Sequence, residues 1–433
     1  MRQYDAIVAG AGVAGATAAL LLARRGLSVL VADRKPERES YKQLCTHFVQ
    51  PHARPVMEKL GLSAALEGIG GVPTKAAFWT SAGWIDPPGD YAVEAGESDG
   101  ALTALNMERR LVDPFMVDRM RATPGIELAL GTAISPPERG DDGLWRATLD
   151  DFGRSGGDGL RHVAAPALIA ADGRRSPIAK ALDNRAELTG ENQRACFFAY
   201  FEGVPEPAGN RSLFYLGDRS MAFLYPLGGT RALLSAYVPK EEGEAWRGDD
   251  QVARLVALFE SFPDCPDLSA ARPVTRMRGY RDYPNLVRRP VHRGAAFVGD
   301  AALSLDPMSG VGCSFAMTTA DMAADALAEV LVPGETPAPD AVDTALEAYT
   351  ARFDAFFPPH AKGIMADSVI AKTPETVRDV YARIVADPDL QRRFIALTGR
   401  LVSPSAFQRA YLMAGIKAKK AATAAPAAAA ADA

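Results

Sequence analysis

The feature that most constrains the fold of this chain is the segment YDAIVAGAGVAGATAALLLARRGLSVLVADR near its amino terminus. It predicts a buried strand over residues 4–9, a tight glycine turn, a helix over about 13–25 that stops at Gly26, and a second strand over 27–32. The two strands are nearly continuously apolar, which is typical of parallel strands covered on both faces. The segment therefore predicts a βαβ unit.

Three glycines inside this unit, Gly10, Gly12 and Gly15, form the pattern GxGxxG between the strand and the helix. Gly10 permits the turn, Gly12 lets the backbone approach a pyrophosphate, and Gly15 lets helix and strand pack closely. The helix start offers N–H groups and about half a positive charge to phosphates. Asp33, at the tip of the second strand, suits a ribose diol and would repel a 2′-phosphate. The loop therefore predicts FAD or NAD, and not NADP.

Composition and charge narrow the class of protein. With 433 residues the chain is long for one core, so two or more domains are expected. The net charge of −5 argues against a nucleic-acid partner. The four cysteines lie far apart without CxxC or metal-ligand spacing, which favours free thiols in a reducing compartment and no metal site. The apolar run over 6–23 is interpreted as the strand and helix above, so no transmembrane segment and a cytoplasmic location are expected.

A second stretch, AAFVGDAALSLDPMSGVGCSFA over residues 295–316, places Gly299 and Asp300 at the end of an apolar strand. A proline, a glycine-rich turn and a helix over about 312–331 follow. The stretch ADGRRSP likewise puts Asp172 at a strand end before a helix. Each aspartate could be a plain helix cap. Three such turns in one chain instead favour a dinucleotide-type cofactor held at several points.

In this order the three motifs resemble flavoprotein monooxygenases of the para-hydroxybenzoate hydroxylase fold, often called group A. The superfamily also contains prenyl reductases and flavin-dependent halogenases, and the resemblance covers roughly residues 1–335. It implies that Asp300 binds the ribityl chain of FAD and that the backbone over 309–314 faces the pyrimidine edge of the flavin. It also implies that Asp172 supports the fold and NAD(P)H handling, and that Arg109 approaches the pyrophosphate or the flavin. The predicted cofactor-binding residues are Gly10, Gly12, Ala14, Gly15, Asp33, Arg34, Arg109, Asp172, Gly299, Asp300, Pro307, Gly310, Val311, Gly312 and Cys313.

The expected fold class is α/β, with a Rossmann-like FAD-binding domain, an inserted antiparallel β-sheet substrate domain and a carboxyl-terminal helical segment. The predicted FAD-binding domain is discontinuous, over 1–75, 101–190 and 286–335. Short β-type runs place the substrate domain at 76–100 and 191–285. Helices are expected over 336–416 and a low-complexity tail over 417–433. Within the substrate domain, Phe223, Tyr225 and Tyr237 fall on strand faces that suit either sheet core or an apolar substrate pocket.

The resemblance implies an FAD-dependent oxidoreductase that NAD(P)H reduces transiently. O₂ would then add at the flavin C4a position, and the hydroperoxide would deliver one oxygen atom to a bound substrate. The expected substrate is an apolar, aromatic or polycyclic small molecule of specialised, natural-product metabolism, and the expected enzyme is a hydroxylase that is a monomer or homodimer. His47, in CTHFVQP, is a candidate acid or base, since its pKa lies near neutrality, and it could equally be a satisfied loop histidine.

Three other functions stay open. A prenyl-type reductase that saturates double bonds without O₂ is the first alternative, because DPMSG is closer to that branch, and Cys45 and Cys313 are compatible with the cysteine often found near its flavin. Aromatic hydroxylases usually carry histidine where this chain has Leu303. A halogenase is less favoured, since WxWxIP is absent and Lys75 reads most simply as a solvated surface lysine. A flavin-binding scaffold without turnover is the last alternative.

Overall fold

The computed structural model describes residues 1–38, 40–45, 48–91, 102–153, 159–370 and 373–429, with side chains up to residue 418. The chain divides into two compact units. Unit 1 comprises residues 1–72, 105–193 and 280–368, and unit 2 comprises residues 73–104, 194–279 and 369–433. Each unit is therefore assembled from three stretches of sequence.

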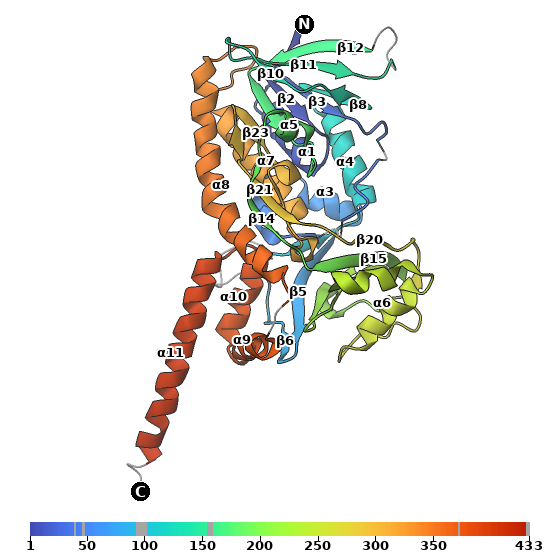
Figure 1. Ribbon diagram of the computed structural model, residues 1–433, viewed down its shortest axis with the longest axis vertical. Coiled ribbons are helices and arrows are strands. Elements are labelled where there is room, and N and C mark those ends of the chain that lie inside the picture. Colours follow the sequence, from blue (N-terminus) through green and yellow to red (C-terminus); the bar gives the residue numbers. More distant parts are fainter. Residues whose placement is uncertain (39, 46–47, 92–101, 154–158, 371–372, 430–433) are drawn as a thin grey trace. The chain divides into compact units, whose positions relative to one another are not determined.

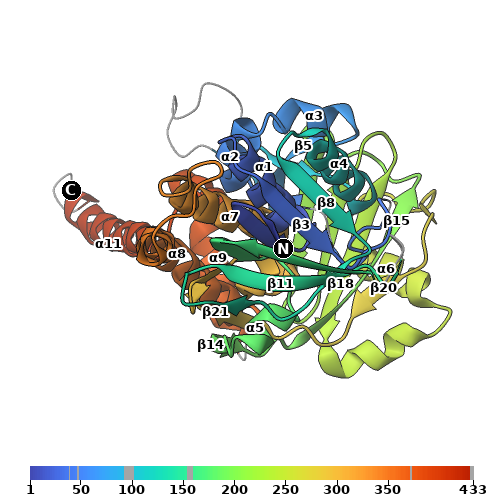
Figure 2. The same cartoon turned by 90° about the horizontal axis from the view of Figure 1, so that it is seen from above.

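A six-stranded sheet forms the centre of unit 1, in the order β22-β23-β13-β2-β3-β8. All neighbours pair in parallel except β22 and β23, and β3 and β8 run side by side in Figure 2. This arrangement confirms the parallel pair predicted from the amino-terminal motif. The strands are β2 (Ala6–Ala9), β3 (Val29–Asp33), β8 (Ile126–Leu130), β13 (Ala167–Ala170), β22 (Val291–His292) and β23 (Ala295–Phe297).

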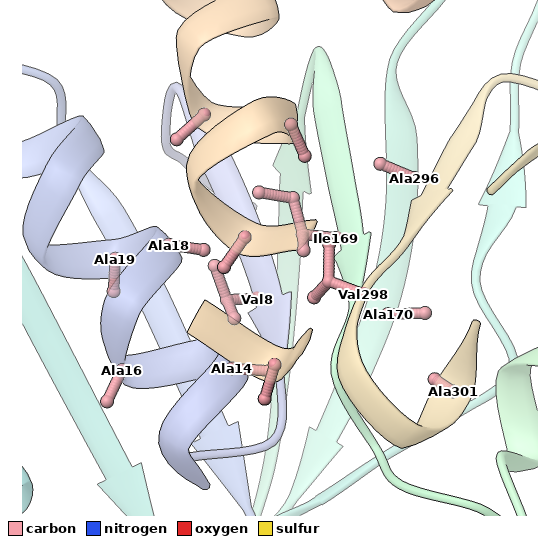
Figure 3. Packing of buried hydrophobic residues seen from close by; sticks show 14 of the residues in the cluster. Val8, Ala14, Ala16, Ala18, Ala19, Ile169, Ala170, Ala296, Val298 and Ala301 are labelled. Carbon is pink, nitrogen blue, oxygen red and sulfur yellow. The ribbon is translucent and has the colours of Figure 1, made fainter. Parts of the chain in front are cut away.

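The principal helices of unit 1 are α1 (Val13–Ala23), α4 (Arg109–Ala122), α7 (Gly312–Ala328) and α8 (Pro339–Asp367). Helix α1 packs against both α4 and α7, and α7 packs against α8 (Figure 1). Figure 3 shows why α1 and α7 come so close: the side chains between them and the sheet, such as Ala14, Ala18 and Val8, are small. All three are buried. Small side chains let backbones approach, so the alanine-rich sequence specifies this tight layer.

Smaller elements complete unit 1 around this layer. A second sheet has the order β1-β12-β11-β10, with β9 paired to β11, and a third has the order β14-β21-β24. Strand β4 pairs with β7. These elements are β1 (Arg2–Gln3), β4 (Phe48–Val49), β7 (Ala104–Asn106), β9 (Ala133–Ile134), β10 (Glu138–Arg139), β11 (Trp145–Asp150), β12 (Leu160–Ala165), β14 (Ala186–Gly190), β21 (Asn285–Arg288), β24 (Leu303–Ser304), α2 (Arg54–Lys59), α3 (Ser63–Gly68) and α5 (Pro177–Ala181), together with the 3₁₀ helices η1 (Pro51–Ala53), η4 (Gly299–Ala301) and η5 (Pro307–Ser309).

A sheet in the order β19-β15-β18-β17-β16-β5 forms the centre of unit 2, with β6 beside β5 and β20 beside β15. Strands β15 to β18 pair antiparallel, as the short β-type runs predict, whereas β16 pairs in parallel with β5. The elements are β5 (Val72–Thr80), β6 (Gly83–Ile85), β15 (Arg194–Glu202), β16 (Arg211–Leu216), β17 (Met221–Pro226), β18 (Ala232–Pro239), β19 (Arg272–Pro273), β20 (Arg278–Tyr280), η2 (Ala208–Asn210), η3 (Lys240–Arg247), α6 (Gln251–Glu260), α9 (Pro374–Ala386), α10 (Pro388–Thr398) and α11 (Pro404–Ala429).

The two faces of the unit 2 sheet are built differently. One face packs on α6 and η3 through an apolar cluster that includes Phe201, Trp246 and Phe259. The other face carries an aromatic cluster in which Phe214 lies 4.8 Å from Phe78 and 4.7 Å from Phe223, measured between ring centroids. A sheet with both faces apolar is covered on both sides.

The helices after residue 336 do not form one block, because α8 belongs to unit 1 and α9 to α11 belong to unit 2. The low-complexity tail continues α11 as far as Ala429. None of the helices that the structure describes has the length and apolar character needed to cross a bilayer.

Candidate functional site

The glycine loop between β2 and α1 is closely packed at Gly10 and Gly15 and open at Gly12. Gly10 has a φ of +107°, and a methyl group there would lie 2.3 Å from the carbonyl oxygen of Ala171. A methyl group at Gly15 would lie 1.8 Å from the carbonyl oxygen of Gly10. At Gly12, the N-cap of α1, a methyl group would meet nothing within 4 Å. Gly10 and Gly15 therefore allow the close packing of the protein itself, and Gly12 keeps the helix start open.

Asp33, the last residue of β3, holds this loop in place. One carboxylate oxygen accepts the N–H of Ala11 at 2.7 Å, and the other accepts the N–H of Lys35 at 2.8 Å. A carboxylate offers about four lone-pair sites, so two remain for further donors. The carboxylate can therefore organise the turn and still accept hydroxyl groups such as those of a ribose.

Asp300 lies in η4 and forms an ion pair that the sequence did not reveal. Its carboxylate is 2.7 Å from the ammonium nitrogen of Lys42. Burial alone would lower the pKa of Lys42, but the attraction of Asp300 outweighs it and the pKa is raised. The backbone N–H of Lys42 also donates to Asp113 in α4. Lys42 thus brings a fixed positive charge beside Asp300.

Arg109, in the first turn of α4, is buried and held by Asp113 at 2.6 Å. Burial alone would lower the pKa of Arg109, but the Asp113 carboxylate raises it, so the guanidinium keeps its charge. One guanidinium nitrogen lies 3.7 Å from the sulfur of Cys45 and 3.6 Å from the sulfur of Cys313. Two thiols and a buried cation therefore meet at one point.

The turn before α7 presents backbone in place of side chains. Gly310 adopts the left-handed conformation, with a φ of +62°, and the side-chain amide of Gln50 donates to the carbonyl of Ser309. A methyl group at Gly312, the first residue of α7, would meet nothing within 4 Å. As at Gly12, a long helix starts where space is open, and its amino terminus favours electron-rich groups.

Asp172 lies in the turn between β13 and α5, which is the third of the turns singled out in the sequence. One of its carboxylate oxygens accepts the N–H of Ile178 at 3.0 Å, and the other is buried without a hydrogen-bond partner among the residues described. Burial raises the pKa of Asp172. A buried oxygen of this kind requires a donor from a bound molecule or a proton of its own.

One cavity of about 1050 Å³ in unit 1 joins these groups. It is large for a small-molecule pocket, for which about 300–1,000 Å³ is usual. Gly15 and Gly299 do not line the cavity; a methyl group at Gly299 would lie 2.8 Å from the side chain of Ala14, so both glycines serve packing. The predicted residues that line the cavity are Gly10, Gly12, Ala14, Asp33, Arg34, Arg109, Asp172, Asp300, Pro307, Gly310, Val311, Gly312 and Cys313.

Three predicted substrate residues lie in unit 2, on the aromatic face of its sheet. Phe223, Tyr225 and Tyr237 are almost fully buried. The ring centroid of Phe223 is 4.8 Å from that of Tyr237, and Tyr225 contacts Phe214. Each of them is part of a packed aromatic cluster, which is the core interpretation of these positions. His47, the candidate acid or base, lies outside the described residues.

Lys75 is buried, contrary to the expectation of a solvated lysine. Its ammonium group lies 2.9 Å from Asp86 and donates to the carbonyl of Pro87. Burial lowers the pKa of Lys75, and Asp86 opposes that shift. In β5 the side chains of residues 75, 77 and 79 share one face and that of Phe78 lies on the other. Lys75 therefore points away from the aromatic face.

The model of a family described as "FAD binding domain" matches residues 3–356. Digeranylgeranylglycerophospholipid reductase 1 of Methanopyrus kandleri is 28% identical over 355 residues, covering 78% of this chain and 83% of the relative. Its reductase 2 is 26% identical over 348 residues, covering 78% and 80%.

A solved structure with the same fold is p-nitrophenol 4-monooxygenase PnpA from Pseudomonas putida DLL-E4. It has a TM-score of 0.72 and 19% identity, covering 93% of this chain and all of that one. At this identity the likeness shows the fold alone, and it confirms the fold expected from the three motifs.

The residues present fit FAD. The open helix starts at Gly12 and Gly312 offer room for backbone contact with the cofactor. Asp33 and Asp300 line the same cavity and offer carboxylates for its hydroxyl groups. The buried oxygen of Asp172 lacks a donor that a cofactor hydroxyl could supply. Lys42 and Arg109 add positive charge for an anionic cofactor. Lys42 was missed by sequence reasoning, because its only signal is a lone lysine in a loop.

Proposed function

The chain belongs to the FAD-binding-domain family and is an FAD-dependent oxidoreductase, and we propose that it is a monooxygenase. It would consume NAD(P)H and insert one oxygen atom of O₂ into an apolar, aromatic or polycyclic small molecule. When bound, FAD supplies the chemistry, accepting a hydride from NAD(P)H and activating O₂. The protein supplies binding, orientation and the exclusion of water.

The observation that carries this proposal is the apolar wall of the cavity near Asp300 and the α7 turn. Leu303, Leu305, Val311 and Phe315 line this part, and each is at most 7% exposed. An apolar wall excludes water, and oxygen transfer requires this because water diverts activated oxygen to H₂O₂. Leu303 has no acidic or basic group. The substrate would therefore be one whose oxidation requires no proton transfer to or from this position.

The binding roles follow from the same geometry. The open start of α1 at Gly12 would take the diphosphate, and Asp33 would accept the hydroxyls of the adenosine ribose. Asp300 would accept ribityl hydroxyls with Lys42 balancing its charge. The start of α7 would face the pyrimidine edge of the flavin and stabilise its negative charge after reduction. Arg109 would hold a further anionic or carbonyl group of the cofactor.

An aromatic substrate is supported by the aromatic face of the unit 2 sheet. Phe78 stacks on Phe214, and Phe214 meets Phe223 edge to face. Tyr225 and Tyr237 belong to the same buried cluster. A flat, apolar molecule that binds beside this cluster would extend it through ring contacts. The substrate domain would therefore select by shape and aromaticity.

Isotope labelling tests this function. Purified holoenzyme is given NAD(P)H and a candidate substrate under ¹⁸O₂ in unlabelled water. We expect one ¹⁸O atom in the product, and no label when ¹⁶O₂ and H₂¹⁸O are used. Product that forms without label under ¹⁸O₂, or that forms equally without oxygen, would exclude the monooxygenase.

A second candidate, an FAD-dependent reductase that saturates carbon–carbon double bonds, is favoured by one observation. Saturation needs a proton as well as a hydride, and Cys45 and Cys313 place two proton-bearing groups on the FAD cavity. The curated relatives are named as reductases of a prenylated lipid, which supports the same reaction class. Anaerobic turnover to a dihydro product would identify this activity.

The halogenase is less well supported than either. The resemblance implies that a halogenase of this superfamily would keep a reactive lysine roughly at the position of Lys75. Here the ammonium group of Lys75 is bound by Asp86 and by the carbonyl of Pro87. An ammonium group held in this way is a poor nucleophile, so Lys75 is better explained as a structural ion pair.

A further inference from the structure

The α7 turn, which comprises residues 306–311, reaches the cavity with its backbone and is anchored on its buried side. Pro307 and Gly310 line the cavity, whereas Asp306 is fully buried. Within the turn, the Asp306 carboxylate accepts the N–H of Met308 at 3.0 Å. This bond shapes the turn but does not attach it to the rest of unit 1, so other contacts must fix its position.

Asn285 attaches the first residue of the turn to helix α8. It is the first residue of β21 and is 1% exposed. Its side-chain oxygen accepts the backbone N–H of Asp306 at 2.7 Å, and its side-chain nitrogen donates to the hydroxyl of Ser368 at 3.1 Å. Ser368, the C-cap of α8, donates in turn to the carbonyl of Ile364 at 2.8 Å. A chain of buried hydrogen bonds therefore runs from the end of α8 through Asn285 to the backbone of the α7 turn.

Gln50 holds the other end of the same turn. It follows β4, is 6% exposed, and donates from its side-chain amide to the carbonyl of Ser309 at 3.2 Å. Neither Gln50 nor Asn285 lines the cavity. The two amides come from different parts of the chain, and they can influence a bound cofactor only through the turn that they hold.

The burial of Asn285 indicates that the position of the turn matters. A side-chain amide is costly to bury unless its polar atoms are bonded, as both are in Asn285. An apolar side chain of similar size would fill the space without that cost. What Asn285 adds is a fixed location for the Asp306 N–H, and with it for the residues that lead into α7.

We propose that Asn285 is a positioning residue that sets the reduction potential of the bound flavin by fixing the α7 turn, with Gln50 as its counterpart. This role rests on the proposed placement of the α7 start at the pyrimidine edge of the flavin. Uptake of two electrons and one proton leaves a negative charge at that edge, which the oxidised flavin lacks. A helix start stabilises such a charge only within its first turn, so a displaced turn weakens the binding of reduced FAD more than that of oxidised FAD.

The test is an anaerobic redox titration of FAD-loaded protein with a reference dye. In Asn285→Leu we expect a more negative potential, because the binding of reduced relative to oxidised FAD should weaken by about threefold to tenfold, and tenfold is about 30 mV for a two-electron couple. Gln50→Leu should shift the potential in the same direction. Ser368→Ala should give a smaller shift, since Asn285 keeps its bond to Asp306.

Asn184→Leu is the matched control for a lost buried amide. Asn184 is 4% exposed, donates to the carbonyl of Arg289 at 3.0 Å and does not line the cavity. Its replacement should lower the melting temperature, as that of Asn285 should, and leave the potential of the flavin unchanged. A wild-type potential in Asn285→Leu, or an equal shift in Asn184→Leu, would overturn the proposal.

Gly312→Ala separates this failure from a wrong placement of α7, because its methyl group would enter the open space at the helix start. A changed potential in Gly312→Ala with an unchanged one in Asn285→Leu overturns the role of Asn285 alone. Unchanged potentials in both overturn the placement as well. The titration contains neither substrate nor O₂, so its result does not depend on whether the enzyme is an oxygenase or a reductase. If Asn285→Leu does not fold, the shift in Ser368→Ala decides.

Discussion

The ammonium nitrogen of Lys42 lies 2.7 Å from a carboxylate oxygen of Asp300, across 258 residues of sequence. The two side chains meet where the loop after β3 passes η4, and both line the cavity of unit 1. Asp300 alone would present an uncompensated negative charge to an anionic cofactor. Lys42 balances that charge, so the pair can accept hydroxyl groups without repelling the diphosphate.

We therefore expect Lys42→Met to weaken FAD binding. The Lys42 side chain is 38% exposed, so solvent screens the pair and the loss should be modest. About 0.5–1 kcal/mol, a two- to fivefold rise in Kd, is reasonable for such a pair. Flavin fluorescence titration measures it. Lys59→Met is the matched control, because Lys59 forms a 2.8 Å ion pair with Asp321 and does not line the cavity. Equal Kd values for both variants would contradict the role of Lys42.

Alanine substitutions at Gly12 and at Gly10 should distinguish an effect on FAD binding from an effect on folding stability. Gly12→Ala meets no protein atom within 4 Å, so we expect near wild-type stability, with a loss of roughly 0.5 kcal/mol for alanine at an N-cap. Its methyl group would occupy the space proposed for the diphosphate, and FAD binding should fall by about tenfold or more, or ~1.4 kcal/mol. Thermal unfolding and FAD titration measure the two effects.

Gly10→Ala should do the reverse. Its methyl group would lie 2.3 Å from the Ala171 carbonyl at a φ of +107°, which costs roughly 2–4 kcal/mol of folding stability. A clear drop in melting temperature is expected even without FAD. If Gly12→Ala unfolds as readily as Gly10→Ala, then Gly12 serves packing and not the cofactor.

The sequence predicts those parts of the site that depend on local backbone geometry. GxGxxG, the aspartate after a strand and the turn before α7 each need particular small or acidic residues at fixed spacing. Thirteen of the fifteen predicted cofactor residues accordingly line one cavity in the structure, whereas Gly15 and Gly299 do not line it.

Contacts made only by tertiary packing could not be predicted in the same way. Lys42 meets Asp300, and Cys45 meets Cys313, because α7 packs on α1 and on the neighbouring loops, and no periodic pattern links residues so distant. The burial of Lys75 was missed for a related reason. A lysine in a strand looks solvated unless its partner, here Asp86 on the following segment, is known.

Lys75→Met tests the halogenase alternative directly. Lys75 pairs with Asp86, which keeps Arg211 at 3.0 Å as a second partner. The variant should therefore fold, and we expect kcat/KM for NAD(P)H-dependent turnover within about twofold of the wild type, as for a residue outside the reaction. Substrate-dependent NAD(P)H oxidation measures it. Abolished product formation in a folded, FAD-loaded variant would restore a catalytic role for Lys75.

Asp172 should make the stability of the FAD-free protein depend on pH. Burial raises its pKa in the folded chain, whereas in the unfolded chain it lies near ~3.9. The folded state therefore holds the proton more tightly, and the stability that this proton contributes is complete below the unfolded pKa. It is lost as the pH rises through the folded pKa, because the ionised carboxylate is left with a buried oxygen that has no hydrogen-bond partner among the described residues.

Asp172→Asn removes this titration and can still accept the Ile178 N–H. The melting temperature of the variant relative to the wild type should therefore rise as the pH increases above about 4. A difference that stays constant, or that falls with pH, would show that Asp172 is not held against its charge. Adding FAD should shrink the difference at neutral pH if a cofactor hydroxyl donates to the buried oxygen, so the same titration with and without FAD also tests the contact proposed at this turn.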